Sequence, residues 1–130
     1  MAKKRRTSNI DFLPTRDEVN VFDMLFPMIQ SDLHEIRELS KKKQDEPLNI
    51  FKVKMINKKL EKAKSILRNE ETTVFLDLLD EETMPTNSDA VLQISQYINA
   101  MENFRGKYYE SDGSLLGLED FDTYEWKTKD

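Results

Sequence analysis

The side chains best suited to metal chemistry lie together near residue 34. His34 and Glu38 stand four residues apart, and two ligands at that spacing on a helix can share a metal ion. Asp32 and Glu35 are close by in the sequence. A catalytic metal site needs a further ligand and a general base, and the chain has no second histidine. We therefore interpret His34 as a surface histidine in an acidic helix, and we predict no metal site.

A second acidic group follows in the sequence. Asp77, Asp80 and Glu81 stand three and four residues apart, and paired carboxylates can hold Mg²⁺ or act as acid and base. Leu78 and Leu79 alternate with them as they would on an ordinary amphipathic helix. We interpret this group as a solvated acidic face.

Other signatures of catalysis are absent from the sequence. The chain has no cysteine, and its three glycines are Gly106, Gly113 and Gly117. The first fact excludes thiolate catalysis, disulfides and cysteine-type zinc sites, and the second argues strongly against a phosphate-binding loop. We predict that the protein is not an enzyme, and we infer no cofactor and no small-molecule substrate.

The elements that would position any site are predicted to be helices. Thr15 and Glu18 form a capping-box signature, and an apolar stripe with steps of four and three follows it. The stripe keeps its register across Pro27, which favours one kinked helix over two unrelated helices. Its members are Phe22, Phe26, Ile29, Leu33 and Ile36.

A second helix is predicted from about Asn49 to Arg68. Its apolar residues follow the alternating steps of three and four of a heptad seam, which is too short for a long coiled coil. We therefore predict that it packs antiparallel on the first helix. The seam consists of Val53, Ile56, Leu60, Ala63 and Leu67.

Two further helices complete the prediction. A short one runs from Thr72 or Thr73 to about Glu82, and the last begins at Thr86 or Ser88 and ends near Gly106. The short helix turns Val74, Phe75, Leu78 and Leu79 inward. The stripe of the last helix consists of Val91, Ile94, Ile98, Met101 and Phe104.

The predicted fold class is all-α. We expect a small bundle of four to five helices over residues 15–110. A flexible basic arm precedes it at residues 1–14, and an acidic aromatic tail follows it at residues 111–130. The chain should have one compact domain, because 130 residues are enough for one core.

Charge comes in alternating blocks along the chain. Residues 1–16 carry a net charge of +4, residues 17–40 carry −5, residues 41–68 carry +7 and residues 69–130 carry −11. The total of −5 therefore conceals strongly polarised parts. Such polarity steers charged partners and favours binding between oppositely charged surfaces.

The basic segments suggest binding to nucleic acid as an alternative function. A helix of about 20 residues is roughly 30 Å long and can follow several phosphates. The composition favours lysine over arginine, and an isoelectric point near 5.0 means that most of the surface would repel phosphate. Nucleic acid is therefore the second choice. The candidate phosphate-binding residues are Lys3, Lys4, Arg5, Arg6, Lys52, Lys58, Lys59 and Lys62.

The tail combines acids with large apolar side chains, as linear binding motifs do. Its candidate partner-binding residues are Leu118, Phe121, Tyr124 and Trp126. One interpretation is that they anchor in a groove of a partner, and the other is that they fold back onto the helices as a short strand or turn. The tail could dock on the basic helix of its own chain or on a cationic cleft of another protein.

The function predicted first is a non-catalytic protein-interaction module, an accessory or adaptor subunit of a larger complex. Its partner would be another protein or a second copy of the chain. The alternatives are a nucleic-acid-associated protein and an acidic mimic of nucleic acid that inhibits a nucleic-acid enzyme. We expect no membrane association and a cytoplasmic location, because no run of about 20 apolar residues exists and no apolar segment follows the basic start.

Overall fold

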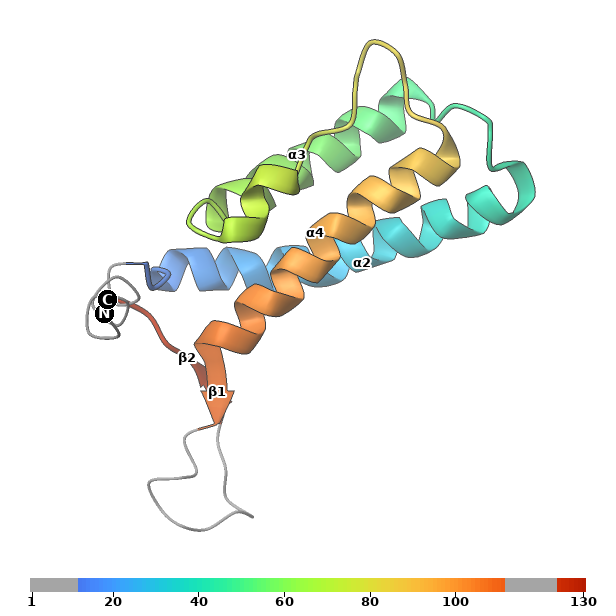
Figure 1. Cartoon of the computed structure of the whole chain (residues 1–130). Coiled ribbons are helices and arrows are strands. Elements are labelled where there is room, and N and C mark those ends of the chain that lie inside the picture. Colours follow the sequence, from blue (N-terminus) through green and yellow to red (C-terminus); the bar gives the residue numbers. More distant parts are fainter. Residues whose placement is uncertain (1–11, 112–123) are drawn as a thin grey trace.

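The computed structural model describes residues 12–111 and 124–130. Helices dominate this part of the chain, which confirms the all-α prediction in its coarse form. Figure 1 shows that α3 and α4 both run opposite to α2, so the three helices pack as an antiparallel group. The α-helices are α2 (Arg16–Lys43), α3 (Ile50–Ile66) and α4 (Asn87–Tyr108).

Helix α2 begins and continues as its sequence predicts. Thr15 accepts a hydrogen bond from the backbone N–H of Glu18, and the Glu18 carboxylate accepts one from the N–H of Thr15. This reciprocal capping box satisfies two of the free donors at the helix start. The five predicted stripe residues are all buried, and Pro27 lies inside one continuous helix.

Helix α3 also confirms its prediction. Asn49 caps it by accepting from the N–H of Lys52, and every residue of the predicted seam from Val53 to Leu67 is buried. The seam lies against α2 and α4, and α3 runs antiparallel to α2 as expected (Figure 1).

The prediction of four to five helices is wrong. Between α3 and α4 the described chain forms only a short 3-10 helix, η1 (Glu71–Phe75), followed by an extended segment. The reason is Asn57 of α3, whose buried side-chain amide donates to the C=O of Leu79 and accepts from its N–H, both at 2.9 Å. Because the N–H and C=O of Leu79 are both bonded to a side chain of α3, they are not available for the hydrogen bonds of a local helix.

This extended path changes which side chains are inward. Leu76 and Leu79 are buried and Leu78 is partly buried, whereas Val74 and Phe75 face solvent. The prediction that Val74 and Phe75 point inward is therefore wrong.

Helix α4 starts on the end of α2. Thr86 caps it by accepting from the N–H of Asp89, one of the two caps predicted. The buried amide of Asn87 donates to the C=O of Lys43 at 2.9 Å, and the N–H of Ser88 donates to the C=O of Gln44 at 3.1 Å. The free donors at the start of one helix thus satisfy free acceptors at the end of the other.

Two short strands follow α4, and the second agrees with the interpretation in which the tail folds back onto the helices as a short strand. Strand β1 (Tyr109–Ser111) pairs antiparallel with β2 (Tyr124–Trp126), and Tyr109 lies opposite Trp126. Trp126 is only 9% exposed and contacts the rings of Phe22 and Phe104 at centroid distances of 5.1 and 5.9 Å. Its indole N–H donates to Asp23.

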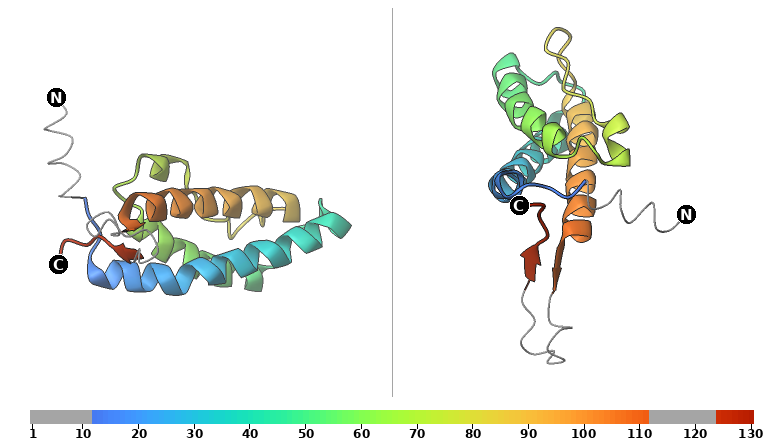
Figure 2. Two further views of the ribbon diagram at one scale, coloured as in Figure 1. Left: turned by 90° about the horizontal axis from the view of Figure 1, so that it is seen from below. Right: turned by 90° about the vertical axis from the view of Figure 1, so that its left-hand side faces the viewer.

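The last residues are hydrogen-bonded to the start of α2 and to the residue before its cap. The N–H of Lys129 donates to the C=O of Pro14 at 2.9 Å, and the Asp130 carboxylate accepts from the N–H of Arg16 at 2.7 Å. The two ends of the described chain therefore lie together, as both views in Figure 2 show. This part of the tail docks on α2 and α4, and not on the basic helix α3.

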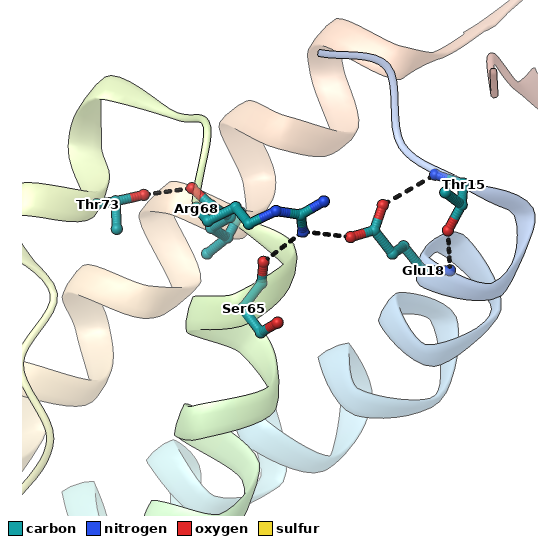
Figure 3. Close-up of polar contacts among 6 residues, drawn as sticks. Thr15, Glu18, Ser65, Arg68 and Thr73 are labelled. Atoms are coloured by element: carbon teal, nitrogen blue, oxygen red, sulfur yellow. Dashed lines mark hydrogen bonds and ion pairs between the residues drawn. The ribbon is translucent and has the colours of Figure 1, made fainter. Parts of the chain in front are cut away.

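Arg68 links the end of α3 to the start of α2. Its guanidinium donates to the Glu18 carboxylate and, at 2.8 Å, to the C=O of Ser65 (Figure 3). Partial burial tends to raise the pKa of Glu18, but the hydrogen bonds from Arg68 and Thr15 outweigh it and hold this pKa below its ordinary value. Thr73 of η1 donates to the C=O of Leu67, which fixes η1 to the end of α3.

The Tyr97 hydroxyl leads to a testable prediction. It is buried without a hydrogen-bond partner among the described residues, and burial, aided by Asp77, raises its pKa to about 12. An unfolded tyrosine titrates near 10, so ionisation favours the unfolded chain and stability falls as the pH rises from about 10 to about 12.

The substitution Tyr97→Phe removes the buried hydroxyl and leaves the ring in place. We expect it to raise the free energy of unfolding at neutral pH by about 1 kcal/mol and to flatten the loss of stability at alkaline pH. Urea unfolding at pH 7 and across the alkaline range measures both. A Tyr97→Phe variant less stable than the wild type at pH 7 would show that the hydroxyl is bonded.

Candidate protein-interaction surface

The acidic residues near His34 are occupied by lysines. Asp32 pairs with Lys59 at 2.9 Å and Glu35 pairs with Lys52 at 3.3 Å, both across the α2–α3 contact. Glu38 pairs with Lys41 on its own helix, and the hydrogen bond and positive charge of Lys41 lower the pKa of Glu38. Within the described ranges no three potential ligands come together as they would to hold a metal ion.

The group at Asp77 is dispersed rather than joined on one helix face. Asp80 accepts backbone N–H bonds from Glu82 and Thr83, which lower the pKa of Asp80 by stabilising its charged form. Glu81 accepts from the Asn57 amide at 3.1 Å. Two of the three carboxylates therefore hold the segment before α4 in shape.

The candidate phosphate-binding lysines divide into two sets. Lys52 and Lys59 are engaged by the acids of α2. Lys58 and Lys62 are exposed, as is Lys54, and these three make no ion pair with any described residue. The other four candidates, Lys3, Lys4, Arg5 and Arg6, lie outside the described residues.

Two large apolar side chains lie beside the unpaired lysines. Phe51 and Met55 precede Lys58 and Lys62 at steps of four, three and four, so the four residues form one stripe on the outside of α3. Phe51 is 70% exposed, and Met55 is also exposed. We call the set of Phe51, Lys54, Met55, Lys58 and Lys62 the basic face.

A groove between α2 and α3 adjoins the basic face. Its volume is about 190 Å³, and Phe51 and Met55 stand on its α3 side. The buried side chains of Ile36 and Ile56 contribute apolar lining, and the two interhelical ion pairs of Asp32 and Glu35 also line it. The groove is thus apolar between charged groups that already neutralise each other.

A second exposed apolar surface lies at η1 and α4. Val74, Phe75 and Leu92 are 78%, 71% and 62% exposed. Phe75 and Leu92 line a hollow of about 290 Å³ together with Asp77, Gln93 and Gln96. Asp89 is exposed one turn before Leu92, and neither Asp77 nor Asp89 pairs with a cation among the described residues. We call the set of Val74, Phe75, Asp77, Asp89 and Leu92 the acidic face.

The predicted partner-binding residues of the tail have different positions. Trp126 is part of the core, so it is not free to anchor in a partner while this packing persists. Tyr124 is 61% exposed and stacks on Tyr109, at the edge of a shallow depression of about 630 Å³ beside Arg105. Leu118 and Phe121 lie outside the described residues.

Sequence reasoning missed both exposed apolar surfaces. Phe51 and Met55 do not belong to the apolar seam of their helix, so their exposure was predictable from their spacing alone. Val74 and Phe75 could not be identified in this way, because their exposure depends on the extended path that Asn57 imposes.

Comparison of the chain with family models, with curated proteins and with solved structures found no match. The surface itself is therefore the basis for assigning a function. Among residues 12–111 and 124–130, no helix has the length and apolar character needed to cross a membrane.

Proposed function

We propose that this protein is a non-catalytic protein-binding module, an accessory or adaptor subunit, which contacts its partner through the basic face and the α2–α3 groove. The observation that carries this proposal is the exposure of Phe51, 70% of whose surface faces water beside an apolar groove. Large apolar side chains grouped at a hollow are a common mark of protein contact sites.

The apolar part of this surface supplies the driving force for binding. Burying a side chain such as Phe or Met contributes roughly 1.5–3 kcal/mol. Methionine is flexible at three bonds, so Met55 can adapt to the shape of a partner. Phe51 and Met55 are one turn apart and can be covered by one segment laid along the groove.

The charged part of the surface determines the kind of partner. Lys54, Lys58 and Lys62 are exposed and unpaired within the described structure, and they surround the apolar positions on one helix. Opposite charges across an interface increase the association rate and exclude wrong partners. The basic face therefore suits a protein segment that carries apolar anchors among acidic residues.

Differential co-purification tests this function. The substitution Phe51→Asp removes the apolar anchor in the first turn of α3, where an acid suits the helix dipole, so the fold is retained. The matched control is Asn99→Asp at an exposed position of α4. After nuclease treatment, a protein partner should purify with the wild type and the Asn99→Asp variant and fall at least about tenfold with the Phe51→Asp variant.

An identical set of proteins from all three forms would contradict the proposed surface. A partner that disappears only from the nuclease-treated samples would instead indicate that nucleic acid bridges the complex.

Nucleic-acid binding is the second candidate function, and the three unpaired lysines of α3 favour it. The described structure limits its strength, since the other two candidates on this helix, Lys52 and Lys59, are held by acids. Contacts to three phosphates would give a slope of log affinity against log salt of about −2.7 for duplex DNA.

Fluorescence polarisation with labelled duplex DNA measures this slope. We expect weak binding with a slope no steeper than about −3 for a variant that lacks residues 1–11. Lys58→Gln with Lys62→Gln should reduce the slope by about 2 in that variant. A clearly steeper slope would show that further cations contact the phosphates and would promote this function to the first choice.

A further inference from the structure

We propose that the acidic face of one copy of this protein binds the basic face of a second copy, so that the chain assembles head to tail. This inference rests on the proposed function, because it uses the basic face as a protein-binding surface. It adds the identity of one partner and assigns a role to the acidic face.

The two faces match in apolar content. Val74, Phe75 and Leu92 are large apolar side chains that face solvent, and Phe75 and Leu92 border a hollow of about 290 Å³. Phe51 and Met55 on the basic face are side chains of a size to cover such a hollow. Their contact would remove both apolar surfaces from water at once.

The two faces also match in charge. Asp77 and Asp89 on the acidic face have no cationic partner among the described residues, and neither Lys58 nor Lys62 on the basic face has an acidic one. Among the described residues, each set therefore lacks opposite charges to pair with in the single copy. Bringing the two sets together is favourable, whereas two like faces would repel.

The faces lie on different parts of the molecule, so they cannot satisfy each other within one rigid copy. The basic face is on the outside of α3, where Phe51 and Met55 border the α2–α3 groove, and the acidic face belongs to η1 and α4. In the right-hand view of Figure 2, α3 and η1 lie on either side of the upper part of the molecule. A contact between two unlike surfaces is heterologous and produces rings or open chains of copies.

Paired charge reversal tests this assembly. One variant carries Lys58→Glu and Lys62→Glu, so both of its faces are acidic. The other carries Asp77→Lys and Asp89→Lys, so both of its faces are basic. Sedimentation velocity from about 10 µM to about 1 mM protein covers the range in which small interfaces associate.

The wild type should exceed its monomer mass of 15.4 kDa as concentration rises, and salt should reverse this because exposed charges are screened. Each variant alone should be monomeric, with association weakened at least about tenfold. An equimolar mixture of the two should associate again, because each acidic face then meets a basic one. A control with Arg37→Glu and Lys42→Glu, at exposed positions of α2, should behave as the wild type.

A wild type that stays monomeric throughout would overturn the inference, and so would an assembly that neither variant weakens. The proposed function is judged separately, by the partner that depends on Phe51 in co-purification. A monomeric wild type with such a partner would reject only the assembly, whereas loss of both results would reject the basic face as a binding surface.

Discussion

Replacing Trp126 with alanine should lower the free energy of unfolding by about 3–5 kcal/mol, the range for removing a large buried aromatic side chain. The indole is 9% exposed and touches the rings of Phe22, Phe104 and Tyr109. A domain of this size is typically stable by about 5–15 kcal/mol, so a large part of its stability would be lost. Urea unfolding followed by far-ultraviolet circular dichroism measures this, since the only tryptophan is removed.

Tyr124→Ala is the matched control for this experiment. Tyr124 lies two residues away in the same strand but is 61% exposed, and we expect a loss below about 1 kcal/mol. Equal, small losses at both positions would contradict the packing of the tail on α2 and α4. They would also restore Trp126 as a side chain available to a partner.

Replacing Asn57 with leucine should lower the free energy of unfolding by about 2–5 kcal/mol. The variant leaves the N–H and C=O of Leu79 without the partner that bonds each at 2.9 Å, and an unsatisfied buried polar group costs about 1–3 kcal/mol. Native-state hydrogen exchange gives a local readout, because the Leu79 amide should lose most of its protection.

Asn99→Leu makes the same chemical change at an exposed helical position, and we expect it to alter stability by no more than about 0.5 kcal/mol. A Leu79 amide that stays protected in the Asn57→Leu variant would refute the assigned hydrogen bonds. It would also remove the physical reason for the exposure of Val74 and Phe75.

The helices that carry their own start signals and apolar stripes were predictable from sequence. The Thr15–Glu18 capping box, the Asn49 start and the seam from Val53 to Leu67 all depend on contacts within one helix or on its periodicity. Such features are determined by residues close in sequence, so they can be predicted without knowing the tertiary contacts.

The segment between α3 and α4 was mispredicted because its conformation depends on a distant residue. The apolar spacing at Val74, Phe75, Leu78 and Leu79 suits a helix, but a buried amide 22 residues earlier bonds both backbone groups of Leu79. Tertiary hydrogen bonds of this kind override a local preference for helix, and they cannot be predicted from the apolar spacing.

The proposed interaction surface was predictable only in part. The excess of lysine on α3 was plain from the charge blocks, but the pairing of Lys52 and Lys59 with acids of α2 needed the interhelical contacts. Because these two lysines are neutralised, fewer cations are free on α3 than the number of lysines in its sequence indicates. The exposed Phe51 beside it then favours a protein partner over phosphate.

Site-specific photocrosslinking at residue 51 is the most direct test of the basic face as a protein-binding surface. A photoreactive phenylalanine analogue replaces Phe51 in the full chain, and a matched form carries the analogue at Asn99, an exposed position of α4 that belongs to neither face. We expect a discrete protein adduct from position 51, absent from position 99 and diminished by Lys58→Glu with Lys62→Glu. The same adducts from both positions, or none from position 51, would contradict the account.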